Sequence, residues 1–141
     1  MQATTQLTQE FIDVIWNQQR FDQLPRFLHA AFHDHSLPAA LPPTAAGLQA
    51  WIMGTSRAFR HHTTIDDQVT EGSKTMLKIR LHLTHVGDFR GLAATGHSLE
   101  AVGYRFFELR EGRIYHHWAL LDGNAIETQL AAVAHGCKIQ E

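Results

Sequence analysis

The chain has little of what several protein classes require. It contains one cysteine, Cys137, so no disulfide can form within it. No apolar run approaches the ~20 residues needed to cross a bilayer, and the first ten residues carry neither the basic region nor the apolar stretch of a secretion signal. These absences favour a cytoplasmic protein without a membrane partner.

An excess of either charge is also absent. The 12 basic and 14 acidic residues give a formal net charge of -2 with neutral histidines, and the basic residues are scattered. Nucleic-acid binders usually cluster their Lys and Arg side chains, so nucleic acid is not an expected partner. With 141 residues, 44% of them hydrophobic, and no low-complexity segment, residues 1–141 are expected to fold as a single domain.

Hydrophobic periodicity predicts helices in the first part of the chain. Apolar residues at helical spacing indicate an amphipathic helix over residues 4–18, and a short helix is expected over 22–28. Residues 29–43 contain three prolines and no sustained period, so they are predicted to form a loop at the rim or lid of a pocket. A third helix is expected after the candidate N-cap Thr44.

The second part of the chain changes to the alternation typical of strands. Strands are predicted around residues 77–83, 97–109 and 114–121, with tight turns before the first and the last of them. A closing helix is expected to begin at a capping box of Asn124 and Glu127. Helices followed by long strands without crossover helices indicate an α+β fold with a mainly antiparallel sheet and helices on one face.

Four segments in order closely resemble the SnoaL-like polyketide cyclases: PPTAAGLQAWI (42–52), TIDDQVTEG (64–72), GDFRGLAATG (87–96) and FELREGRIYHHWALLD (107–122). The last segment is the most specific, since a Gly turn is followed by Ile, by His-Trp and by Asp four residues after the Trp. The resemblance implies the nuclear transport factor two-like fold. This is an α+β barrel in which a curved, mainly antiparallel sheet wraps as a cone around N-terminal helices, with a C-terminal helix and an internal ligand pocket. It also implies a homodimer formed through the outer sheet face.

The same resemblance implies chemistry without a cofactor or a metal. In the family, the Asp that closes the last strand is the acid/base, which corresponds to Asp122. One carboxyl group can remove a C–H proton and later protonate an alkoxide, so the expected reaction is an aldol-type cyclisation or related proton transfer on a small hydrophobic carbonyl substrate. In a regular last strand, Asp122 shares a face with Ile114, His116, Trp118 and Leu120. The alternative is that Asp122 caps the closing helix.

Further side chains are candidates for positioning the substrate. The resemblance places a His near the pocket mouth, which favours His35 and His33; Trp51, Tyr104, His116 and Trp118 are weaker candidates. Each of them can instead be a core, sheet-pairing or surface residue. Most of the 11 histidines occur in short clusters, but none has the spacing of a metal motif, and adjacent pairs point to opposite strand faces. No metal site is predicted.

Alternative functions remain open at this point. Related cones host isomerases, dehydratases and epoxide hydrolases, and a second carboxylate such as Glu100 or Glu108 beside Asp122 would favour that class. A non-enzymatic module that binds a small apolar molecule is the second alternative. A dimerisation domain with a filled cone is the third.

Overall fold

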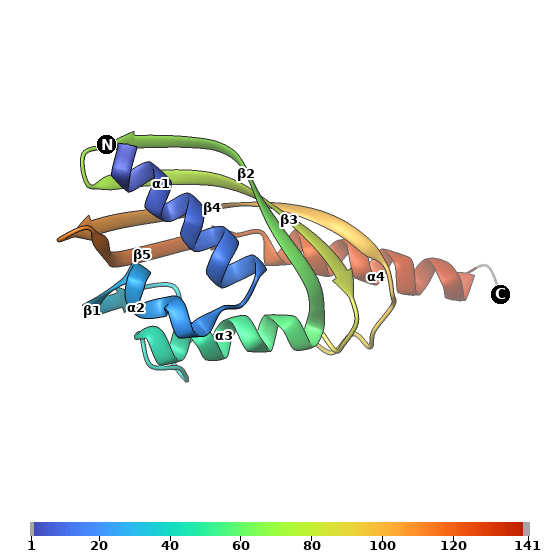
Figure 1. Cartoon of the computed structure of the whole chain (residues 1–141). Coiled ribbons are helices and arrows are strands. Elements are labelled where there is room, and N and C mark those ends of the chain that lie inside the picture. The colour runs from blue at the N-terminus through green and yellow to red at the C-terminus, as the bar shows by residue number, and fades with distance from the viewer. Residues whose placement is uncertain (1, 140–141) are drawn as a thin grey trace.

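The computed structural model describes residues 2–139 and contains four α-helices and five strands (Figure 1). The helices are α1 (Gln2–Phe11), which continues as a π-helical segment (Ile12–Asn17), α2 (Leu24–Phe27), which follows a 3₁₀ turn (Phe21–Gln23), α3 (Ala45–Ala58) and α4 (Gly123–Ile139). The strands are β1 (Leu28–Asp34), β2 (Phe59–Glu71), β3 (Lys74–His85), β4 (Ser98–Arg110) and β5 (Arg113–Leu121). None of the helices in the described range has both the length and the apolar character that crossing a bilayer requires.

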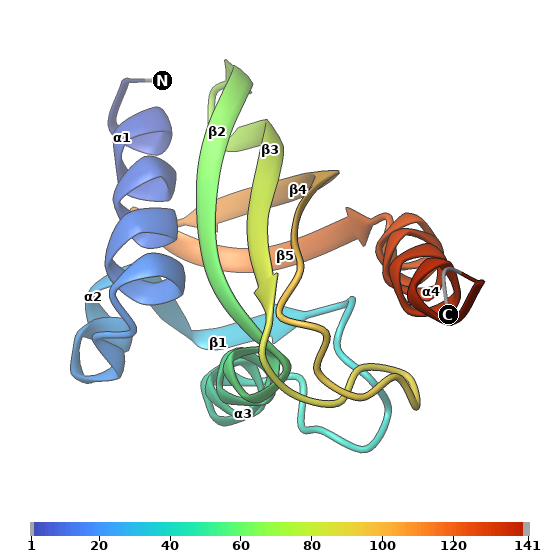
Figure 2. The same ribbon diagram turned by 90° about the vertical axis from the view of Figure 1, so that its right-hand side faces the viewer.

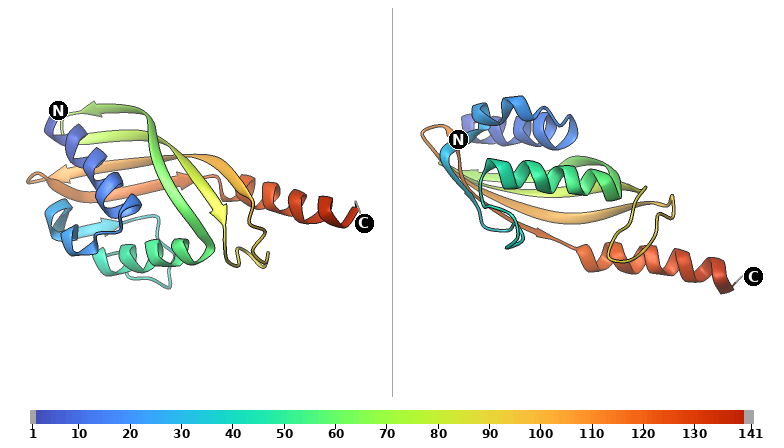
Figure 3. Two further views of the ribbon diagram at one scale, coloured as in Figure 1. Left: turned by 45° about the vertical axis from the view of Figure 1, so that its right-hand side comes forward. Right: turned by 90° about the horizontal axis from the view of Figure 1, so that it is seen from below.

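The strands form one curved sheet in the order β1-β5-β4-β3-β2. Strands β2 to β5 pair antiparallel with their neighbours, whereas β1 runs parallel to β5. Helices α1, α2 and α3 lie on one side of the sheet, and the sheet bends around that side (Figure 2). Helix α4 leaves the end of β5 and extends away from the other helices (Figure 3). The predicted α+β cone with a mainly antiparallel sheet and a C-terminal helix is confirmed.

The hydrophobic core fixes the N-terminal helix against the inner face of the sheet. Phe11 meets the rings of Phe27 and Phe107 edge to face, at centroid distances of 5.9 and 5.7 Å. Leu77 and Ile79 of β3 are completely buried on the same face. Fully burying side chains of this size contributes about 1.5–3 kcal/mol each, so this cluster anchors the helices over the sheet.

Strand β1 was not predicted, because it lies partly in the segment expected to be a loop. Its burial pattern is irregular, and its pairing with β5 also shifts register between Leu28 and His33. The strand therefore depends on pairing with a neighbour distant in sequence rather than on its own alternation. Phe32 and Asp34 are buried on its inner side. The prolines follow in the loop between β1 and α3.

The start of α4 also differs from the prediction. The Asn124/Glu127 capping box is wrong, since the carboxylate of Asp122 accepts the Ala125 backbone N–H at 2.9 Å. Arg90 instead donates to both Asn124 and Glu127. Asp122 therefore fills the usual role of an acidic N-cap residue.

A β-bulge in β5 changes which side chains face the interior. Leu109 of β4 pairs with Ile114, but the preceding Glu108 pairs with His116, so Tyr115 is an extra residue. An extra residue reverses the alternation beyond it. The prediction that Ile114 and His116 share a face is therefore wrong: Ile114 is completely buried, and the next inward side chain is His117, which is 4% exposed.

Candidate active site

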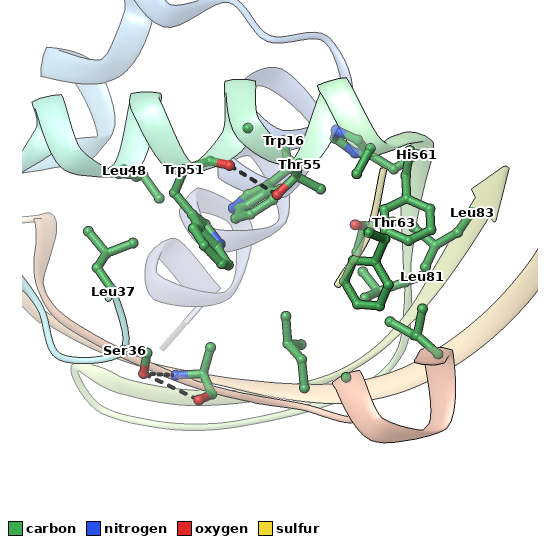
Figure 4. Close-up of a pocket in the computed structure, with 18 of the residues that line it drawn as sticks. Trp16, Ser36, Leu37, Leu48, Trp51, Thr55, His61, Thr63, Leu81 and Leu83 are labelled. Carbon is green, nitrogen blue, oxygen red and sulfur yellow. Dashed lines mark hydrogen bonds between the residues drawn. The ribbon is translucent and has the colours of Figure 1, made fainter. Parts of the chain in front are cut away.

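A cavity of about 800 Å³ lies between the helices and the inner face of the sheet. Figure 4 shows side chains converging on it from opposite sides, with Trp51 from α3 and Leu81 and Leu83 from β3. Leu37 and Leu41 from the proline-containing loop also line the cavity, as expected for a rim. The volume and the mostly apolar walls suit a small hydrophobic ligand.

Three charged or ionisable side chains meet in the wall of this cavity. Asp34 ends β1, Arg105 lies on β4 and His117 lies on β5, and each is less than 5% exposed. His117 Nδ1 donates to Asp34 Oδ2 at 2.9 Å, and Arg105 Nη1 donates to His117 Nε2 at 3.3 Å. The carboxylate, imidazole and guanidinium therefore form a continuous chain, which fixes the proton of a neutral His117 on Nδ1.

Local backbone contacts hold this arrangement in place. The backbone N–H of His35 donates to the carbonyl of His117 at 2.9 Å, which joins the end of β1 to β5. The second carboxylate oxygen of Asp34 accepts the backbone N–H of Ser36 at 2.9 Å, in an Asx turn. Both oxygens of Asp34 thus have partners inside the protein, and the carboxylate cannot easily turn away from His117.

The protonation states follow from burial and from these contacts. Burial lowers the pKa of His117 and the positive charge of Arg105 lowers it further, while the hydrogen bond to Asp34 opposes the shift. Burial alone would raise the pKa of Asp34, but the hydrogen bond and charge of His117, the Ser36 N–H and Arg105 outweigh it, so this pKa is lowered. At neutral pH the site therefore contains an ionised Asp34 and a neutral His117.

Arg105 remains a cation despite its burial. Desolvation lowers its pKa from 12.5 to about 10, and the charge of Asp34 opposes this. The guanidinium carbon lies 4.2 Å from the ring centroid of Trp16, a cation–π contact. His61 lies edge-on to the same indole at 6.1 Å, and burial followed by the charge of Arg105 lowers its pKa.

Of the residues predicted for the site, only Trp51 lines this cavity. It is 39% exposed, which puts it at the open end. Asp122 is exposed, caps α4 and is not among the lining side chains. The geometry therefore agrees with the alternative considered from the sequence, in which Asp122 caps the closing helix. The role of Asp122 as an acid/base stays a prediction.

The other predicted residues lie on the outer side of the sheet: His33, His35, Tyr104, His116 and Trp118. His35 stacks on Trp118 with ring centroids 4.5 Å apart and hydrogen-bonds to His116 at 2.8 Å. His33 lies 4.3 Å from His35, ring to ring. None of these five side chains lines the cavity, so the expected substrate contacts are not supported by position.

Sequence reasoning missed Asp34 and Arg105 and gave no special weight to His117. A signal was available for Arg105, since the inward positions of β4 are otherwise Leu, Ala, Gly, Phe and Leu. A charged residue within such an apolar series indicates a functional or paired buried group. No comparable pattern was available for Asp34, which lay in a segment read as a loop.

Comparison with known proteins agrees with this architecture. TsrD from Streptomyces laurentii is 23% identical with a TM-score of 0.81, and the match covers 94% of this chain and 97% of that one. IdmH from Streptomyces antibioticus is 21% identical with a TM-score of 0.81, over 91% of this chain and 98% of that one. A SnoaL-like polyketide cyclase from Agrobacterium tumefaciens is 20% identical with a TM-score of 0.76, over 92% of this chain and 99% of that one. At these identities the likeness shows the fold alone. A search of curated proteins gave no match.

The sequence itself matches a family model over most of its length. The match spans residues 6–130, from α1 into α4, and the model describes SnoaL-like polyketide cyclases. It therefore includes all the strands of the cone and every residue of the buried Asp34, Arg105 and His117 chain. On this match, the protein belongs to the SnoaL-like polyketide cyclase family.

Proposed function

We propose that the protein is a cofactor-independent enzyme that moves a proton on a hydrophobic carbonyl compound inside the cavity, as in an aldol-type cyclisation. The observation that carries this proposal is the buried contact between His117 and Asp34 in an otherwise mostly apolar wall. His117 replaces Asp122 as the candidate acid/base. Membership of the cyclase family supports the substrate class and the type of reaction.

The chemistry follows from the tautomer of His117. With its proton on Nδ1, the imidazole has a lone pair on Nε2 that can accept a C–H proton made acidic by an adjacent carbonyl. Asp34 then stabilises the imidazolium that forms, as the carboxylate does in hydrolase triads. The same Nε2–H can return the proton to an alkoxide, so one residue serves both steps of a cyclisation.

Arg105 has two effects on this step. Its charge stabilises negative charge that develops on a substrate oxygen, an effect that is strong in a desolvated site. Its hydrogen bond to Nε2 occupies the lone pair in the free protein. At 3.3 Å this contact is slightly longer than a usual N–H hydrogen bond, and it must open before Nε2 can accept a proton from a substrate. The same contact favours the second candidate function, a non-enzymatic module that binds a small molecule without transferring a proton.

Proton exchange distinguishes these functions without knowledge of the natural substrate. The protein is incubated in deuterated buffer with ethyl 2-naphthoylacetate, a hydrophobic β-keto ester, and loss of the α-proton signal is followed by NMR. The enzyme hypothesis predicts faster exchange than in buffer alone. His117→Gln should reduce this acceleration by about 100-fold or more, because general acid–base catalysis typically contributes that much.

Asp122→Asn is the matched comparison for His117→Gln. Asn is as good an N-cap as Asp, so this substitution removes the charge while preserving the start of α4. Exchange that persists in Asp122→Asn but is lost in His117→Gln supports the buried pair. The reverse result would restore Asp122 as the acid/base, and absence of acceleration by the wild-type protein would favour the binding module.

We also propose a homodimer formed through the outer face of the sheet. This face exposes large apolar side chains on neighbouring strands, with Met76 at 41%, Tyr104 at 43%, Trp118 at 38% and Leu120 at 76% exposure. Contiguous exposed apolar surface commonly marks a protein interface.

Light scattering after size-exclusion chromatography tests the dimer. Leu120→Glu should yield a monomer, because it places a charge within the apolar face. Met53→Glu is the control, since Met53 is 45% exposed on α3 rather than on the sheet. A wild-type monomer, or a dimer that tolerates Leu120→Glu, would refute the assigned interface.

A further inference from the structure

Arg105 has free hydrogen-bond donors in the buried wall of the cavity. Its Nη1 donates to His117, but Nε and Nη2 have no hydrogen-bond partner anywhere in the described part of the chain. The residue is 2% exposed and lines the cavity. These two donors therefore point neither to bulk solvent nor to a protein acceptor.

The carboxylate that acts on Arg105 already accepts hydrogen bonds from other donors. Asp34 is the one negative charge that influences the pKa of Arg105, and its two oxygens accept hydrogen bonds from His117 and Ser36. Within residues 2–133, no carboxylate lies within 4.0 Å of the Arg105 guanidinium. Burial of a cation without such a partner is costly unless a ligand supplies the missing acceptors.

The free donors have a specific geometry. Nε–H and one N–H of Nη2 lie on the same edge of the planar guanidinium, and their spacing matches the two oxygens of a carboxylate. The guanidinium carbon lies 4.2 Å from the centroid of the Trp16 ring, and this contact restricts movement of the guanidinium. The Nε1–H of Trp16 is buried and also lacks a partner among the described residues. This part of the cavity thus offers donors for a planar anion with two oxygens.

The rest of the cavity suits the apolar part of such a ligand. Leu48, Leu81 and Phe59 line the walls, and each of these side chains is less than 9% exposed. The exposed side chains of Trp51 and Arg57 also line the cavity, which therefore meets solvent there. A hydrophobic ligand in this cavity can therefore pack against these walls and direct a polar group to the buried guanidinium of Arg105.

We propose that Arg105 binds the carboxylate of a hydrophobic carboxylic acid through Nε and Nη2, so that a keto acid binds more tightly than the corresponding neutral ester or ketone, which can still occupy the cavity at higher concentration. This inference rests on the proposed function in taking the cavity as the substrate site. The carboxylate end is held at Arg105, and the reacting carbon lies within reach of His117, whose Nε2 is 3.3 Å from the guanidinium.

Binding of the anion also prepares His117 for proton transfer. The positive charge of Arg105 contributes to the lowered pKa of His117 in the free protein. A bound carboxylate offsets that charge, which raises the basicity of the imidazole, and competes with Nε2 for the guanidinium. Substrate binding and release of the base are therefore coupled through one side chain.

A pair of matched fluorescent probes tests this assignment. Anthracene-2-carboxylate and anthracene-2-carboxamide have nearly the same shape and differ in charge. Their affinities for the full-length wild-type protein are measured by fluorescence and calorimetric titration at neutral pH. We expect the acid to bind about 10- to 100-fold more tightly, as for a charge-assisted bidentate contact in a buried site. Equal affinities, or no binding of the acid, would overturn the proposal without the need for a variant.

Two arginine variants locate the contact. Arg105→Met should reduce the affinity for the acid to that for the amide, after circular dichroism has shown that the variant is folded. Arg57→Met removes the same charge from the exposed rim and should change the affinity by less than about threefold, as expected of a solvent-exposed charge. Acid affinity that survives Arg105→Met would overturn the assignment.

The failure of this inference is distinguishable from failure of the proposed proton transfer. His117→Gln keeps an acceptor for Arg105 Nη1, so it should retain the preference for the acid while losing exchange activity. A wild-type protein that prefers the acid but never accelerates exchange would refute the enzyme and leave the carboxylate site standing. Exchange activity with equal affinities for the two probes would refute the carboxylate site and leave the proposed proton transfer standing.

Discussion

Replacement of Arg105 by Met should stabilise the protein while removing its selectivity for acids. Burial lowers the pKa of Arg105 from 12.5 to about 10. Because each pKa unit corresponds to 1.36 kcal/mol, the charged form costs roughly 3 kcal/mol in the folded state. Met is apolar and of similar length, so the variant avoids this cost.

Lost contacts reduce the gain. The hydrogen bond to His117 contributes about 1 kcal/mol, and the cation–π contact with Trp16 contributes about 0.5–2 kcal/mol. The expected net effect is stabilisation by about 1 kcal/mol, or roughly 3–4 °C in Tm for a domain of this size. A binding site that costs stability is typical of proteins whose function needs a buried charge.

Urea unfolding at neutral pH, followed by circular dichroism, measures this difference in the free energy of unfolding. The pKa of Arg105 is lowered on folding, so its charge destabilises the folded state at every pH below about 10, and the cost disappears only as the pH rises from there toward 12.5. The difference between variant and wild type should therefore be constant from pH 7 to 9. Destabilisation of Arg105→Met by more than about 1 kcal/mol would contradict this prediction, because it would mean that the guanidinium is well compensated without a ligand.

Three other predictions concern the site and its supports. If neutral His117 is the base, the protein-catalysed exchange rate should rise with pH and then level off as the imidazole loses its proton. Because burial lowers the pKa of His117 from 6.5, the midpoint of this rise should lie below pH 6.5, and a midpoint above that pH would exclude His117. Gly47→Ala should destabilise the protein by about 1–3 kcal/mol, because the added Cβ would lie 1.7 Å from the Pro42 carbonyl oxygen. Gly54→Ala in the same helix adds a Cβ that meets nothing closer than 3.4 Å and should stabilise the protein by about 0.5–1 kcal/mol. Equal Tm values for the two variants would contradict this packing. Asp122→Ala should cost about 1 kcal/mol through the lost N-cap, and a neutral result in thermal unfolding would mean that the cap contributes nothing.

Most of the fold could be predicted because it follows from local pattern. The helical spacing after Thr44 indicates one buried face, and these residues form α3. The alternation from Leu77 to Leu83 likewise indicates one buried face, and these residues lie in β3. The turn expected between Arg110 and Arg113 joins β4 to β5, and these two residues pair across it. Such signals are contained in a few neighbouring residues, so they need no knowledge of distant contacts.

The candidate site was less predictable because its geometry is set by pairing between distant strands. Asp34 becomes an inward residue only because β1 pairs with β5, whose residues lie about 80 positions later in the chain. His35 was favoured instead, yet it lies one residue further along and projects to the outer side against Trp118. Neighbouring residues of a strand face opposite sides, so an error of one position exchanges a cavity residue for a surface residue.

The bulge at Tyr115 decides which of two adjacent histidines faces the cavity. Without this extra residue, the regular alternation from Ile114 would turn His116 inward and His117 outward. With the bulge, the inner positions become His117 and Ala119, and Ala119 pairs across the sheet with Arg105. Ala119 lines the cavity together with Arg105, and its small side chain is compatible with the proposed approach of a ligand carboxylate to Nε and Nη2. One inserted residue thus places the proposed base in the cavity wall, puts a small residue opposite the cation and directs His116 and Trp118 to the outer face, where the proposed dimer interface lies.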